Sequence, residues 1–248
     1  MKVDFSQAYG LLRSLWMYHA YPGRHRRAVQ FYGQFIRPGD LCFDVGAHVG
    51  GRVRAWIALG ARVVAVEPQP QCLAWLEHMY GRSDQVEIVP AALGTEAGNA
   101  TLHISRRTPT VTTMSDRWIE SLSSVRSFRR VSWDRQVEVD MLTLDHLIAR
   151  FGEPAFCKID VEGFEYEVLQ GLSRPLRALS FEYLPARPDL AIACLTYLAS
   201  LGNYRFNRSL GEQMQWFEPE WLGERAMIEQ LQQISPDSIS GDVYARLE

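Results

Sequence analysis

A glycine-rich turn flanked by acids is the part of this sequence whose residue types most clearly suit ligand binding. The stretch FDVGAHVGG, residues 43–51, follows an apolar run, and Glu67 ends the next apolar run about 20 residues later. Glycines after a strand let the backbone turn sharply and let a ligand approach it closely. An acid at the end of the second strand can accept hydrogen bonds from ribose hydroxyls. The pattern predicts a site for a cofactor that contains a nucleoside.

The turn differs from the loop that binds a dinucleotide. In that loop three glycines let a pyrophosphate rest on a helix N-terminus, whereas here His48 takes the middle glycine position and Asp44 precedes Gly46 by two residues. A carboxylate at this place repels a pyrophosphate and favours a ligand with a cationic amine. S-adenosylmethionine has a ribose, an ammonium and a sulfonium but no phosphate, so the turn favours it. An NAD-dependent oxidoreductase and a non-catalytic nucleoside-binding module are the alternatives.

A second charged element, KIDVEG at residues 158–163, ends another apolar run. Strand alternation would place Lys158, Asp160 and Glu162 on one side, and charges on a buried strand are costly unless they are paired or functional. In one interpretation Lys158 and Asp160 form an ion pair and Glu162 caps the next helix. In the other, which we favour, Asp160 faces the cofactor and Glu162 faces the second substrate. Two adjacent carboxylates would raise the pKa of one of them, as suits a general base.

Three further features have both a functional and a structural interpretation. Glu182, at the end of a later apolar run, could orient an acceptor hydroxyl or pair with Lys158. His48 could act as a reserve base or bond to the backbone. The arginine-rich segment 106–135 could form a lid over an anionic or carrier-bound acceptor, or a solvated surface helix near residues 117–128.

Alternation of apolar runs with helical stretches predicts an α/β fold with a parallel sheet covered on both faces. The runs 41–46, 61–68 and 86–93 form the first three predicted strands, and the runs 155–163 and 178–184 follow later. Two helices over about residues 4–36, broken at Tyr21-Pro22-Gly23, precede them. The division is therefore an N-terminal helical addition, 1–36, and one domain, 37–248. Extra strands are expected at 101–105 and 136–142, and an antiparallel pair at the end.

Composition excludes several classes of protein. The chain has 248 residues, a net charge of −3 and a pI near 6.1, which does not suit a nucleic-acid partner. No apolar run approaches the length of a membrane span, so no membrane partner is expected. The four cysteines lack metal-ligand spacing, so we expect buried thiols in a cytoplasmic protein and no metal site. The sequence leaves open whether the protein forms a homodimer.

The sequence resembles the FkbM family of S-adenosylmethionine-dependent methyltransferases. The resemblance implies a class I methyltransferase, Rossmann-like fold: a seven-stranded, mostly parallel sheet with an antiparallel last strand and helices on both faces. It also implies O-methylation of a small molecule such as a sugar, a polyketide or another secondary metabolite. The matching blocks are DVGAHVG (44–50), ALGARVVAVEPQP (58–70), KIDVEGFE (158–165), VLQGL (168–172), SFEYL (180–184) and LGNYRFNRSLGE (201–212).

Roles for individual residues follow from the matched blocks. Gly46, Ala47 and Gly50 would surround the methionine moiety, and Asp44 would lie near its amine. Glu67 would hold the ribose hydroxyls, and Pro68 would lie beside the sugar. Ala91 and Ala92 would contact the adenine, and Asp160 would face the methyl donor. His48, in the same turn as Gly46, completes the predicted cofactor contacts. Asp160, Glu162 and His48 are the candidate catalytic residues, and Lys158 and Glu182 the candidate substrate contacts.

Overall fold

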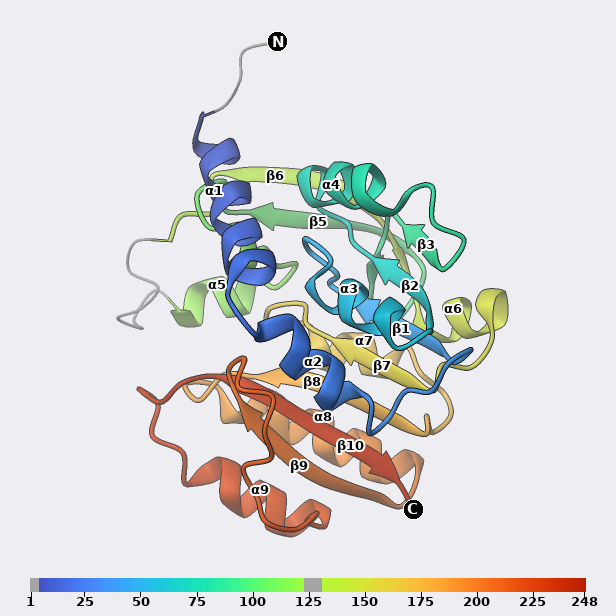
Figure 1. Ribbon diagram of the computed structural model, residues 1–248. Helices are drawn as coiled ribbons and strands as arrows, with labels where there is room; N and C mark the ends of the chain where they lie inside the picture. The colour runs from blue at the N-terminus through green and yellow to red at the C-terminus, as the bar shows by residue number, and fades with distance from the viewer. Residues whose placement is uncertain (1–4, 123–130) are drawn as a thin grey trace.

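The computed structural model describes residues 5–122 and 131–248 and contains one central seven-stranded sheet (Figure 1). The strand order is β3-β2-β1-β7-β8-β10-β9. Pairing is parallel from β3 to β8, and β10 is antiparallel to both β8 and β9. The expected mostly parallel sheet with an antiparallel last strand is therefore confirmed. The strands are β1 Leu41–Val45, β2 Arg62–Val66, β3 Val86–Val89, β7 Phe156–Ile159, β8 Ala178–Tyr183, β9 Tyr204–Leu210 and β10 Gly241–Leu247.

Helices cover both faces of the sheet, as its Val- and Ile-rich strands require. One apolar core lies between the sheet and α6 to α9, and another lies between the sheet and α2 to α4. All four cysteines are buried free thiols. The helices are α2 Arg24–Tyr32, α3 Gly51–Ala58, α4 Pro70–Tyr80, α6 Leu144–Phe151, α7 Glu165–Gln170, α8 Pro188–Leu201 and α9 Glu224–Gln232.

The chain leaves the central sheet at Pro90. A single third strand over residues 86–93 is wrong, because β3 ends at Val89 and β4, Ala92–Leu93, pairs instead with a second sheet. Proline has no backbone N–H and cannot continue a ladder. The second sheet has the order β4-β6-β5, and β5, Gly98–Ile104, and β6, Arg135–Leu142, confirm the two expected extra strands. Between them lie the short helix η2, Pro109–Val111, and α5, Asp116–Leu122.

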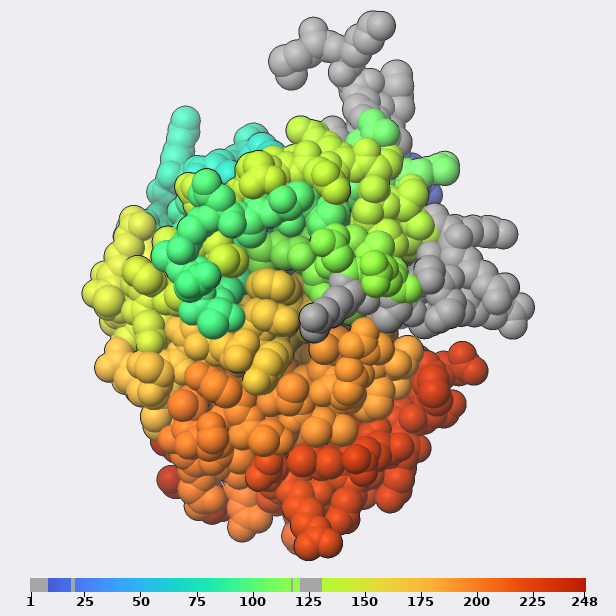
Figure 2. Space-filling view, turned by 180° about the vertical axis from the view of Figure 1, so that it is seen from behind, coloured from blue at the N-terminus to red at the C-terminus, as the bar shows by residue number. Residues whose placement is uncertain are grey.

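The N-terminal helices lie on the α2–α4 face of the sheet. α2 packs into the core through Ala28, Phe31 and Tyr32, all buried. Before it, α1, Phe5–Leu15, and the π-helical turn η1, Trp16–Ala20, contact η2 and α2. The deep blue of these helices is almost hidden when the molecule is seen from behind (Figure 2). Because Phe31 belongs to the same core as the sheet, α2 supports the domain that comes after it.

We predict that Phe31→Ala lowers the free energy of unfolding by about 3–5 kcal/mol, because it removes a ring buried among Phe35, Trp216 and Tyr244. Urea denaturation followed by far-ultraviolet circular dichroism measures this loss. The matched control is Phe217→Ala, whose ring is 49% exposed, with an expected loss of at most about 1 kcal/mol. Equal, small losses in both variants would show that residues 1–36 are an appendage rather than part of the core.

Candidate functional site

The turn after β1 lies against the end of β7. Gly46 has a φ of +82°, and a Cβ built on it would lie 1.9 Å from the carbonyl oxygen of Asp160. Only glycine fits this close approach. The backbone amides of Gly46 and Ala47 donate to the carbonyl of Val66 at 2.9 and 3.0 Å, which ties the turn to β2. The predicted sites at the two strand ends are therefore brought together at one sheet edge.

Glu67 is the polar anchor of this turn. Its carboxylate accepts hydrogen bonds from the backbone amides of His48 and Gln69, both at 2.7 Å. His48 has a φ of +51°, a left-handed conformation that is uncommon outside glycine. Burial raises the pKa of Glu67 to about 7, although these two amides oppose the shift. The carboxylate retains lone pairs that can accept from a ligand's hydroxyls.

A cavity opens at the ends of β1, β2 and β7. Seven of the ten predicted cofactor contacts line it, and they share a place on the carboxyl edge of the sheet: Gly46, His48, Glu67, Pro68, Ala91, Ala92 and Asp160. Asp44 and Ala47 line a smaller neighbouring cavity together with Arg52 and Lys158. Gly50 lines neither cavity. It is the N-cap residue of α3 and has a φ of +78°.

Two segments line the first cavity without any residue that the sequence predicts to contact the cofactor. Three cavities adjoin at this edge of the sheet: the first cavity, a second large cavity that contains Glu182, and the small third cavity that contains Asp44. Tyr18 of η1 lines all three, and its ring is edge-on to that of His48, with 5.7 Å between the centroids. The irregular segment 109–114 forms the opposite wall, where Thr112 donates to the Gln69 side chain at 2.8 Å. Tyr18 lies in the predicted N-terminal helices and residues 109–114 in the segment considered as a lid, but no motif marks either as part of the cofactor site.

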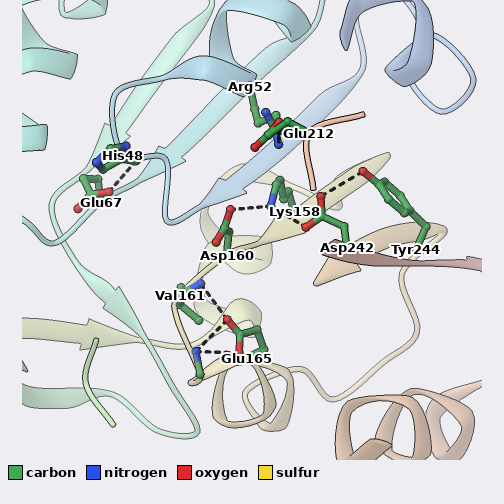
Figure 3. A network of polar contacts seen from close by, with 11 residues as sticks. His48, Arg52, Glu67, Lys158, Asp160, Val161, Glu165, Glu212, Asp242 and Tyr244 are labelled. Carbon is green, nitrogen blue, oxygen red and sulfur yellow. Dashed lines mark hydrogen bonds and ion pairs between the residues drawn. The ribbon is translucent and has the colours of Figure 1, made fainter. Parts of the chain in front are cut away.

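Beneath the cavity the buried ammonium of Lys158 joins the end of β7 to β10 (Figure 3). Lys158, 1% exposed, donates to Asp160 at 2.8 Å and to Asp242 of β10 at 3.1 Å. The ion pair that we considered the less favoured interpretation is therefore present. Lys158 lines the small third cavity and not the two larger ones, so its ammonium is held by these carboxylates rather than presented to a substrate. Nearby, Arg52 pairs with Glu212 at 2.7 Å.

The alternation predicted through residue 162 ends early, because β7 stops at Ile159. Glu162 has a φ of +55°, and its carbonyl accepts from the Thr113 hydroxyl at 2.7 Å. Glu162 does not cap the next helix, because the N-cap of α7 is Phe164, which makes no side-chain cap hydrogen bond. Instead Glu165, the first residue of α7, holds the preceding turn, since its carboxylate accepts from the backbone amides of Val161 and Gly163 at 3.1 Å. The Glu162 side chain is thus left to line both larger cavities.

Three carboxylates meet where the two larger cavities join. Oxygens of Asp160, Glu162 and Glu182 lie within 4.8 Å of one another, a spacing that could also hold a metal ion, although the sequence predicts no metal site. Burial raises the pKa of Asp160, but the Lys158 ammonium outweighs this and keeps it below its usual value. Burial and the charge of Asp160 raise the pKa of Glu162 well above its usual value, and burial with the charge of Glu162 does the same for Glu182. The three neighbouring acids therefore differ in pKa: that of Asp160 is lowered, and those of Glu162 and Glu182 are raised.

The second cavity begins at Glu162 and Glu182 and runs outward between aromatic walls. Trp118 of α5 and Tyr183 of β8 form two of these walls. Gly163 has a φ of +87°, and a Cβ on it would lie 2.0 Å from the Trp118 ring, so the indole packs directly on the backbone beside Glu162. Trp118 of the arginine-rich segment thus lines the cavity, while Arg126, Arg129 and Arg130 lie outside the described residues.

The model of the family described as the methyltransferase FkbM domain matches residues 44–211. The match covers more than half of the chain and includes the turn after β1, the end of β7 and Glu182. The chain belongs to the FkbM methyltransferase family. The methyltransferase uses S-adenosylmethionine, which confirms the predicted cofactor and overturns the NAD-dependent alternative.

Solved methyltransferases share the fold. A TehB-like SAM-dependent methyltransferase from Corynebacterium glutamicum is 10% identical, with 98% of both chains covered and a TM-score of 0.50. The precorrin-6y C5,15-methyltransferase from Geobacter metallireducens is 12% identical, with 89% of this chain and 87% of that chain covered and a TM-score of 0.45. Among curated proteins, none matches the chain significantly.

The residues at the turn suit the cofactor chemically. Asp44 is 2% exposed, and its Oδ2 has no hydrogen-bond partner among the described residues, so it can accept from an ammonium. Burial raises the pKa of Asp44 to about 6. Glu67 can accept from the ribose hydroxyls, and Ala91, Ala92 and Leu102 offer an apolar surface for the adenine. The S-adenosylmethionine assignment thus agrees with the polar groups present.

Removing the buried ammonium should destabilise the protein. We predict that Lys158→Met lowers the free energy of unfolding by about 3–5 kcal/mol, because Asp242 would be left as an unpaired buried charge and Asp160, whose side chain is 33% exposed, would lose its ammonium partner. Urea denaturation gives the value. Arg225→Met, which breaks the exposed pair with Glu229, is the control and should change it by less than about 0.5 kcal/mol. A Lys158→Met protein as stable as the control would contradict the role given to the ammonium.

Cofactor binding should depend on pH through Glu67. The ionised carboxylate accepts the ribose hydroxyls, so affinity should fall by up to about tenfold per pH unit as the pH drops below about 7, where Glu67 becomes protonated. Glu67→Gln should weaken binding about tenfold to a hundredfold and remove this step, leaving a lower one from Asp44 near pH 6. Calorimetry with S-adenosylmethionine between pH 5 and about 7.5 measures both, with the points nearest pH 7.5 corrected for the partial titration of the ligand's own amine. Exposed Glu87→Gln is the control, and affinity of the wild-type protein independent of pH would refute the assignment.

Proposed function

We propose that the methyltransferase is an O-methyltransferase that acts on a hydroxyl of a small molecule, with Glu162 as the general base. The observation that carries the proposal is the position of Glu162, which lines both larger cavities and has a pKa well above its usual value. A hydroxyl needs a proton acceptor as it becomes a nucleophile, whereas an amine that is neutral already carries a free electron pair. A strong base at the junction of the two cavities therefore favours a hydroxyl acceptor.

S-adenosylmethionine supplies an electrophilic methyl group on a sulfonium. The residues of the chain position the acceptor, exclude water and take the proton. Asp160 is ionised and held by Lys158 at 2.8 Å, which makes it a weak base but a fixed negative charge beside a cationic ligand. Glu162 accepts the hydroxyl proton. His48 lines the first and third cavities and not the second, which places it further from the acceptor as a reserve base.

The second cavity favours a neutral acceptor. Among the described residues its lining has the carboxyl groups of Glu162, Glu165 and Glu182 against the single arginine Arg13, so an anionic group beside them would oppose the ionisation that Glu162 needs to act as a base. Glu182 can accept a second hydroxyl of the acceptor, and Trp118 and Tyr183 offer flat apolar faces to its ring. A sugar or a polyketide alcohol fits this lining, and it fits better than the anionic acceptor suggested by the arginine-rich segment.

The chemical class of the product tests the proposal. We expect label from methyl-labelled S-adenosylmethionine to appear in methyl ethers when the enzyme is given a panel of monosaccharides and polyketide alcohols with matched amines. Mass spectrometry and NMR identify the methylated atom. Label found only on nitrogen or carbon would contradict O-methylation, and no transfer to any compound would favour the non-catalytic alternative.

The role of Glu162 has its own test on any acceptor found in that panel. We predict that Glu162→Gln lowers kcat by a factor of about 10²–10⁴, while the affinity for S-adenosylmethionine stays within about threefold, because Glu162 takes a proton rather than holding the cofactor. The wild-type rate should rise with pH as Glu162 ionises, and exposed Glu87→Gln should behave as wild type. An unchanged kcat would remove Glu162 from the mechanism. Loss of wild-type activity in EDTA, restored by Mg²⁺, would instead assign the three carboxylates to a metal ion.

A further inference from the structure

The first helix turns its large apolar side chains away from the protein. On its inner side, a Cβ on Gly10 would lie 2.6 Å from the carbonyl oxygen of Arg106, and Ser14 is 1% exposed. On its outer side Tyr9, Leu12 and Trp16 are 64%, 65% and 64% exposed. An amphipathic helix of a globular protein normally buries its apolar face.

Three of the exposed side chains lie on one helical face, and a fourth follows shortly after in the chain. Tyr9, Leu12 and Trp16 follow the spacing that places residues on one helical face, and Tyr21, which comes after η1, is 54% exposed. In the described part of the chain seven large apolar side chains are strongly exposed, and these four are among them. A concentration of this kind marks an interaction surface. We call these four residues the aromatic stripe.

Positive charge accompanies the aromatic stripe. Residues 5–39 contain five arginines and neither aspartate nor glutamate, although the whole chain has a net charge of −3. Arg13, Arg26 and Arg27 are exposed and form no ion pair with any carboxylate in the described ranges. Arg24 lies 5.2 Å from the ring of Tyr18 and 6.0 Å from that of Tyr21, which joins the stripe to α2.

We propose that the aromatic stripe, with Arg13, Arg26 and Arg27, binds the surface of a membrane that contains anionic lipids. Tryptophan and tyrosine favour the boundary between acyl chains and headgroups. Helices that present such residues beside arginines lie in that boundary, and the cations are attracted to anionic headgroups. A second copy of this chain fits less well, because two cationic surfaces would then face each other.

This proposal differs from the expectation that no membrane is a partner. That expectation rested on the length needed to span a bilayer, and no helix in the described ranges is long and apolar enough to do so. A helix that lies on the surface needs only one apolar face. Arg13 and Met17 also line the second cavity, so a bound membrane would lie beside the mouth of that cavity.

Vesicle sedimentation tests the proposal without cofactor or acceptor, so its outcome is independent of the proposed O-methylation. We expect the full chain to sediment with vesicles of phosphatidylcholine that contain about one-third phosphatidylglycerol, and at least tenfold less with pure phosphatidylcholine. Arg13→Glu/Arg26→Glu/Arg27→Glu and Leu12→Ser/Trp16→Ser should each lower binding at least tenfold. Brominated lipid should quench the fluorescence of the wild-type protein more than that of Trp16→Phe.

Met79→Ser, at an exposed apolar residue on α4, is the matched control and should bind as wild type. Thermal unfolding checks that each variant is folded. The proposal is overturned if the wild-type protein binds neither vesicle, or if Leu12→Ser/Trp16→Ser binds as well as wild type. It is also overturned if sedimentation of the protein alone shows a dimer that Leu12→Ser/Trp16→Ser converts to a monomer, since the stripe would then be an interface between copies.

Discussion

The ammonium group of Lys158 is the charge on which the arrangement of the site depends. It lies on a central strand, buried between Asp160 at the end of β7 and Asp242 on β10. A buried cation is stable only when carboxylates pair with it, so Lys158 fixes Asp160 in its ionised form. That fixed negative charge then makes ionisation of Glu162 and Glu182 harder. Because of one buried lysine, Asp160 has a lowered pKa and pairs with the ammonium, whereas Glu162 and Glu182 have raised pKa values.

A second constraint brings this charge to the cofactor. Gly46 allows the turn after β1 to contact the carbonyl of Asp160, and Glu67 holds the same turn through two backbone amides. The carboxyl ends of parallel strands meet at one edge of the sheet, which is where open α/β sheets bind ligands. The turn after β1 and the carboxyl groups of Asp160 and Glu162 therefore share an edge, while Tyr18 of η1 lines all three cavities.

Strand ends were more predictable from the sequence than the loops and turns beyond them. Asp44, Glu67 and Asp160 end apolar runs, and alternation with helices implies a parallel sheet, so their meeting at one edge could be inferred. The place of Glu162 could not, because the left-handed φ at this residue ends the alternation on which the prediction relied. Pro90 ended the third strand early although the residue was visible in the sequence. On α1 the periodicity showed which residues share a face but not whether that face points inward, because packing against η2 decides the direction.

The low pKa of Asp160 and the high pKa of Glu162 can be measured by an NMR titration of the side-chain carboxyl groups. The protein would carry ¹³C in the side-chain carboxyls of its aspartates and glutamates, with Asp160→Asn and Glu162→Gln used to assign the two signals. We expect Asp160 to lose its proton at a pH below the usual range of an aspartate, and Glu162 at a pH well above the usual range of a glutamate. Ordinary titration of both groups would contradict this expectation.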